Sequence, residues 1–126
     1  MINEVILASS SGIRLKILKD NKFKVKQVSP GVDEDEIKAS LINSGATCLQ
    51  IAKNLAELKA NRISAKFPSE VVIGADQVLD FEGKNYSKPK NKDEAKSILK
   101  LLNNNKHFLQ SAVCVSRGGS MITNFH

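Results

Sequence analysis

The chain has 126 residues, of which 41% are hydrophobic and 25% charged, and its formal net charge is +6. These values suit one globular domain with one core, residues 1–126. They argue against a membrane span, which needs roughly 18 consecutive apolar residues, and the start of the chain lacks the basic region of a signal peptide. The only cysteines, Cys48 and Cys114, are far apart and form no CxxC pattern, so we expect no disulfide framework, no zinc site and a cytoplasmic location.

The positive charge also fits a nucleic-acid partner, but other features argue against one. The lysines are spread along the predicted helices, often beside Asn and Ile, rather than gathered in one patch. Aromatic residues make up 5% of the chain, which leaves few rings to stack on bases. We therefore expect a small anionic substrate instead of a nucleic acid.

Strands and helices alternate along the predicted chain. In order we expect a strand over 3–8, a helix over 11–20, a strand over 23–28, a helix with an acidic first turn after Pro30-Gly31, a helix from the Thr47/Gln50 capping box to about 65, strands over 70–75 and 77–81, a helix after the Asn91/Glu94 cap, and a hairpin of strands over 107–117 and 120–126. This order predicts an α/β fold with a mixed twisted sheet flanked by helices. The chain stops inside the returning strand with no helix to cover it, which predicts a shortened product or fragment.

Lys59 breaks the pattern of its helix. It lies on the apolar stripe of that helix, which consists of Ala52, Leu55, Ala56 and Ile63. A lysine in this position either extends along the surface to reach solvent or presents its ammonium group to an anion in a polar cleft. The sequence leaves both alternatives open.

Two carboxylates and a second lysine are further candidates. Asp76 interrupts two apolar runs at the end of a predicted buried strand, where ligand sites of α/β sheets are common; it either caps a turn or serves as a ligand or base. Glu34 lies in the acidic run DEDE, which alone is explained by the helix dipole. Lys88 precedes a proline and on its own is typical of a surface lysine.

The segment ASSSGIR links the first strand to the first helix. Its serines and glycine stand at a helix N-terminus, where free N–H groups bind phosphate, and Arg14 would add a planar fork of donors. The segment is not a Walker A loop, because no Gly-Lys-Ser/Thr follows. Taken with Glu34, Lys59, Asp76 and Lys88, it supplies the residue types that metal-assisted phosphoryl chemistry uses.

Six short motifs between residues 5 and 115 together resemble the Maf family of nucleotide pyrophosphatases. They are LASSSGIR (7–14), VDE (32–34), LAELKA (55–60), GADQV (74–78), KP (88–89), and His107 with SA (111–112). The resemblance implies a fold like that of Maf and inosine triphosphatases. It also implies a metal-dependent hydrolase that cuts a nucleoside triphosphate between its α- and β-phosphates and thereby cleans the nucleotide pool.

The same resemblance implies roles for individual residues. Asp76 would be the proton acceptor that activates water, and with Glu34 it would hold Mg²⁺ or Mn²⁺. The triphosphate-binding residues would be Ser9, Ser11, Arg14, Lys59 and Lys88. A homodimer is a further expectation from the family.

The chain departs from the family pattern at positions that bear on specificity. Gly12-Ile13 replaces the common Pro-Arg, and Gln77 replaces the threonine of members that act on dTTP and UTP. Glutamine there resembles the branch that acts on 7-methyl-GTP, so Ile13 and Gln77 are the predicted specificity residues. Family chains also continue for roughly half as much sequence again, including a segment that lines the nucleotide pocket. The alternative is therefore a degenerate, non-catalytic nucleotide-binding or regulatory protein of the same fold.

Overall fold

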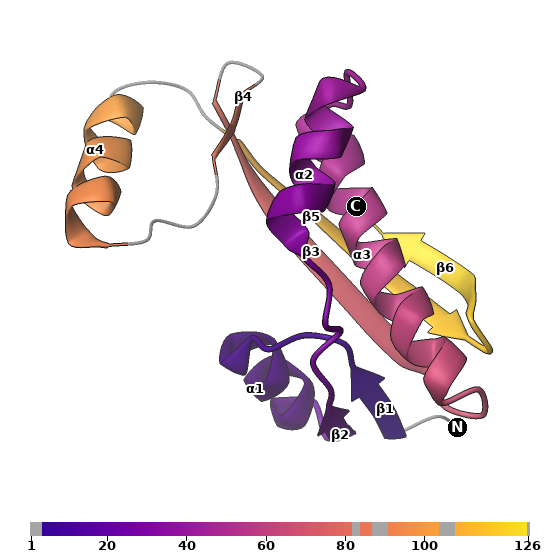
Figure 1. Ribbon diagram of the computed structural model, residues 1–126. Coiled ribbons are helices and arrows are strands. Elements are labelled where there is room, and N and C mark those ends of the chain that lie inside the picture. The colour runs from indigo at the N-terminus through magenta and orange to yellow at the C-terminus, as the bar shows by residue number, and fades with distance from the viewer. Residues whose placement is uncertain (1–3, 82–83, 87–90, 104–107, 126) are drawn as a thin grey trace.

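The computed structural model describes residues 4–81, 84–86, 91–103 and 108–125 (Figure 1). In chain order the elements are β1 (Glu4–Leu7), α1 (Gly12–Asp20), β2 (Lys24–Gln27), α2 (Glu34–Asn43), α3 (Cys48–Lys66), β3 (Val72–Phe81), β4 (Lys84–Tyr86), α4 (Lys92–Leu102), β5 (Phe108–Arg117) and β6 (Ser120–Phe125). None of the helices in these ranges combines the length and the hydropathy of a membrane-crossing segment.

The strands form one mixed sheet in the order β2-β1-β3-β5-β6, and β4 pairs with the end of β3. β1 is parallel to both β2 and β3, whereas β5 is antiparallel to both of its neighbours, β3 and β6. The pairing of β3 with β5 is the longest in the sheet and runs without a shift from Val72/Ser116 to Asp80/Phe108. This arrangement confirms the predicted α/β fold with a mixed sheet.

Helix α3 covers the central strands and forms the core with them (Figure 1). Its buried stripe includes Ile51, Leu55 and Ile63, none of which is more than 1% exposed. Gly74 on β3 permits the close approach of this helix, because a Cβ at that position would collide with the Ala56 carbonyl and lie 2.7 Å from the Ala60 nitrogen. The strand that carries the candidate base is therefore held tightly against the helix that carries Lys59.

Local signals set the ends of the elements. Ser11, Asp33, Thr47 and Asn91 each accept a hydrogen bond at the N-terminus of a helix, and Thr47 forms the predicted capping box with Gln50. The β5–β6 hairpin turns at Gly118 and Gly119, whose φ angles of 64° and 82° belong to the left-handed region that a two-residue hairpin requires.

The prediction of separate strands over 70–75 and 77–81 is wrong. The structure has one strand, Val72–Phe81, that passes through Asp76 and Gln77 without a break. The polar pair does not end the strand, because Asp76 finds a partner in Lys59 on α3 and Gln77 lies on the other, exposed face. Continuous pairing with β5 holds the backbone extended through both residues.

Candidate active site

The loop between β1 and α1 is organised by the Ser9 hydroxyl. Ser9 is 4% exposed, and its Oγ accepts hydrogen bonds from the Ser11 backbone N–H at 3.1 Å and from Arg14 Nη1 at 3.0 Å. Ser11 in turn caps α1 by accepting from the Arg14 N–H at 3.3 Å. Because a guanidinium group carries five N–H donors, Arg14 is oriented by Ser9 and keeps donors for an anion at the start of the helix.

A second group of charges lies between α2, α3 and β3. The Lys59 ammonium lies 2.5 Å from Glu34 Oε1 and 3.2 Å from Asp76 Oδ1. The Lys59 side chain is 5% exposed, so it does not reach for bulk solvent, and that alternative is excluded. Lys59 instead joins the two carboxylates that the sequence singled out.

Asp76 is in an unusual electrostatic environment. Burial raises the pKa of Asp76 above its ordinary value; the Lys59 and Lys38 ammonium groups oppose this rise, and the Glu34 carboxylate adds to it. Asp76 Oδ1 bonds Lys59, whereas Oδ2 is buried and has no hydrogen-bond partner in the described part of the chain. An unpaired buried carboxylate oxygen is costly, so Oδ2 is the atom of this group that a water molecule or a cation would satisfy.

Strand pairing brings the serine loop towards Asp76. Leu7 pairs with Ile73 in the parallel register, and the Ala8 N–H donates to the Ile73 carbonyl at 2.8 Å. The chain then leaves β1 on the same side on which β3 continues to Asp76, since parallel strands run in the same direction. The loop and the carboxylate are therefore at neighbouring positions along the sheet, beyond the carboxyl end of β1, which is where ligands of such sheets bind.

Lys38 is a charged neighbour that the sequence analysis missed. It is half-buried on α2, one helical turn after Glu34, and its charge acts on the Asp76 carboxyl. The spacing of Glu34, Ile37, Lys38 and Leu41 was the available signal, because it places Lys38 on the inward stripe of α2.

The predicted specificity residues do not join these groups. Ile13 is 75% exposed on α1. Gln77 is exposed and pairs across the strands with Ser111, and strand alternation turns it to the face opposite to that of Asp76. Lys88 and His107 lie outside the described residues.

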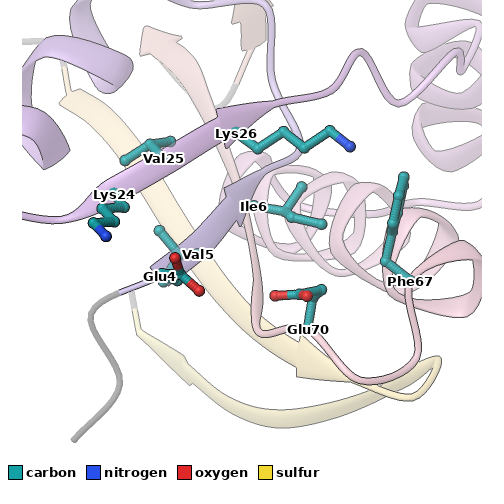
Figure 2. Close-up of a pocket in the computed structure, with 8 residues that line it drawn as sticks. All are labelled: Glu4, Val5, Ile6, Lys24, Val25, Lys26, Phe67 and Glu70. Atoms are coloured by element: carbon teal, nitrogen blue, oxygen red, sulfur yellow. The ribbon is translucent and has the colours of Figure 1, made fainter.

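A cavity of about 320 Å³ lies at a different end of the sheet (Figure 2). It is lined by Glu4, Val5, Ile6, Lys24, Val25, Lys26, Phe67 and Glu70. These residues belong to β1, β2 and the segment after α3, and the Lys26 ammonium lies 4.9 Å from the centre of the Phe67 ring. The cavity contains none of the candidate site residues, and its mixed charges do not select an anion.

The two carboxylates suit a divalent cation that takes some of its ligands from the protein and the others from a bound substrate. No group of three or more His, Cys, Asp or Glu side chains comes together within the described ranges, so the chain offers no closed metal cage there. Glu34 and Asp76 offer two carboxylates, and Mg²⁺ is commonly held by one or two carboxylates together with substrate phosphates. Asp76 Oδ2, which has no hydrogen-bond partner in the part of the chain that the structure describes, agrees with such a site.

Comparison with known proteins gives one family match and relatives that share one name. The sequence profile of the family described as "Maf-like protein" matches residues 4–125. A protein of Pelagibacter ubique named "Nucleoside triphosphate pyrophosphatase" is 54% identical over 125 residues, which are 99% of this chain and 64% of that protein. A protein of Caulobacter vibrioides with the same name is 46% identical over 96% of this chain and 60% of its own length.

A third relative carries a narrower name. The "7-methyl-GTP pyrophosphatase" of Brucella abortus is 36% identical over 97% of this chain and 61% of its own length. The chain thus spans less than two thirds of the length of each of these three relatives.

Proposed function

The chain belongs to the Maf-like protein family, and from this premise we propose that it acts as a nucleoside triphosphate pyrophosphatase. The proposed reaction hydrolyses the bond between the α- and β-phosphates and releases a nucleoside monophosphate and pyrophosphate. The names of the relatives support the reaction class. The observation that carries the proposal is the buried Asp76 carboxylate, with one oxygen held by Lys59 and the other without a hydrogen-bond partner among the described residues.

Asp76 is suited to the role of general base. Its Oδ2 would accept the proton of the attacking water while the phosphoanhydride bond breaks and pyrophosphate leaves. A general base works best when its pKa lies near the working pH, and burial raises the pKa of Asp76 in that direction. Lys59 fixes Oδ1, and through it the orientation of the carboxylate.

The phosphates would bind between the serine loop and the charged cluster. The free N–H groups at the start of α1 favour an anion, and Ser9 holds the Arg14 guanidinium beside them. Lys59 and Lys88 remain predicted phosphate ligands.

We propose Mg²⁺ or Mn²⁺ as the cofactor, with Glu34 and Asp76 as its protein ligands. A bound divalent cation would neutralise charge on the leaving pyrophosphate. Lys59 contacts Oε1 of Glu34 and Oδ1 of Asp76, so the cation would bind the second oxygen of a carboxylate or take the place of the Lys59 ammonium on the first.

For the substrate we propose a purine triphosphate with a modified base. Gln77 in place of threonine argues against dTTP and UTP, and the name of the Brucella abortus relative gives 7-methyl-GTP as the first nucleotide to test. The roles of Ile13 and Gln77 in this choice stay predictions, as do a homodimer and a cytoplasmic location.

The test is pyrophosphate release from a panel of ordinary and modified nucleoside triphosphates, with Mg²⁺ or Mn²⁺ and with a chelator. We expect release from at least one nucleotide, its loss in Asp76→Asn, and little change in Asp20→Asn, whose carboxylate is exposed at the end of α1. Failure of the folded chain to turn over any nucleotide with either metal would refute the enzyme proposal. Binding of a triphosphate without turnover would instead favour the non-catalytic alternative.

A further inference from the structure

The inward face of α2 carries a lysine where its pattern calls for an apolar residue. Ile37 and Leu41 pack against the core, and Glu34 reaches Lys59. Lys38 lies on the same stripe, four residues after Glu34, next to Ile37 and three residues before Leu41. It is half-buried. Lys38 is therefore directed toward the α2–α3 side of the site rather than toward open solvent.

The surroundings of Lys38 bear a balanced charge before any substrate binds. From the elements that meet there, the charged groups are Glu34 and Lys38 on α2, Lys59 on α3 and Asp76 on β3, and their formal charges cancel. Lys59 already bonds both carboxylates. No ion pair of Lys38 occurs within the described ranges, although its charge reaches Asp76. Lys38 is a half-buried lysine whose ammonium the carboxylates do not hold, so it is available to a further anion.

We propose that Lys38 is an additional substrate-binding residue, which donates to the phosphate chain of the triphosphate from the side opposite to Arg14. This inference rests on the proposed function, since it assigns one more ligand to the same site. Lysine binds phosphate as a compact point charge on a flexible stem, which suits a ligand that approaches the phosphates from a neighbouring helix. The serine loop with Arg14 and helix α2 with Lys38 then bracket the phosphates.

The test compares Lys38→Gln with the wild-type chain in pyrophosphate release, with KM and kcat measured separately. Loss of one charge-assisted phosphate contact should raise KM about tenfold, with kcat changed less than about twofold. Lys38→Arg should stay near wild type. The matched control is Lys96→Gln, which removes the same charge from an exposed position on α4. A second measurement is the calorimetric affinity for a triphosphate with a methylene bridge between its α- and β-phosphorus atoms, and it should fall in parallel with KM.

The failure of this inference can be told apart from the failure of the proposed function. If wild type is active and Lys38→Gln has an unchanged KM, the inference is overturned and the proposed function stands. A lower kcat at constant KM also overturns it, because Lys38 would then act on Asp76 and not on the phosphates. If wild type shows no turnover but Lys38→Gln weakens binding of the methylene analogue, the inference survives and the enzyme proposal fails. Absence of both binding and turnover in wild type refutes both.

Discussion

Replacing Lys59 with methionine tests whether the charged cluster is held as the structure describes. Lys59→Met keeps a long unbranched side chain on the apolar stripe of α3 but removes the only cation in contact with Asp76 and Glu34 among the described residues. Asp76 would then be a buried carboxylate without a hydrogen-bonded counter-charge. Its neighbour Glu34 would add repulsion, since it also raises the pKa of Asp76.

The size of the effect follows from burial. Breaking a buried ion pair by removing one partner costs about 3–5 kcal/mol. The Glu34 side chain is 41% exposed, so water screens most of its interaction with Lys59. We therefore take the lower end of this range, about 3 kcal/mol, as the loss of stability. For a domain of this length such a loss lowers the melting temperature by roughly 10 °C.

The loss of stability in Lys59→Met, relative to wild type, should depend on pH. A carboxyl group whose folded-state pKa is raised adds stability below its unfolded pKa, about 3.9 for Asp, and this stability is lost as pH rises through the folded pKa. Lys59→Met raises the pKa of Asp76 further, because the wild-type ammonium lowers it. The difference between variant and wild type should therefore be largest at pH 7.5 and shrink at pH 5.

The assay is urea unfolding at both pH values in the presence of a chelator. Lys66→Met at the exposed end of α3 is the control, with an expected loss under about 1 kcal/mol from its favourable position at the helix C-terminus. Wild-type stability of Lys59→Met at pH 7.5, or a deficit that does not shrink at pH 5, would refute the reasoning about the cluster.

Three other substitutions test the surroundings of the site. Asp76→Asn should abolish pyrophosphate release and yet raise the urea midpoint at pH 7.5, because it removes a buried carboxylate whose pKa is raised; a lower midpoint would contradict this. Gly74→Ala should destabilise the chain by about 2–3 kcal/mol in chemical denaturation, since its methyl group collides with Ala56 and Ala60 on α3, and a change under about 0.5 kcal/mol would show that the contact is loose. Thr47→Ala should cost about 1 kcal/mol by loss of the cap of α3, measured as a lower melting temperature with unchanged KM for the nucleotide.

Much of the fold could be predicted because its signals are local. The caps at Thr47 and Asn91 and the Gly118-Gly119 turn lie within a few residues of the elements that they delimit. Each satisfies backbone groups or a left-handed conformation that the adjoining residues create. Such signals can be recognised without knowing what packs against the element.

The continuous strand β3 could not be predicted in this way. Asp76 and Gln77 break the apolar run, and by local rules they indicate a turn. The strand persists because Lys59, 17 residues away in the chain, bonds the Asp76 carboxylate, and because β5 pairs with both residues. A carboxylate in the middle of a strand can be interpreted only when its counter-charge is known, and the counter-charge here lies on another element.

Lys59 and Lys38 both lie on the inward stripe of a helix, and the same rule of helical spacing identifies both. The apolar stripe of α3 led to Lys59 from sequence alone, and the same rule applied to α2 leads to Lys38. Lys38 was missed because the helix dipole already accounts for the acidic run at the start of α2. A lysine on an inward stripe either extends its side chain to solvent or pairs with a negative charge. Lys59 contacts the carboxylates of its own chain, whereas Lys38 forms no ion pair among the described residues, and we therefore expect it to bind an anion that arrives from outside.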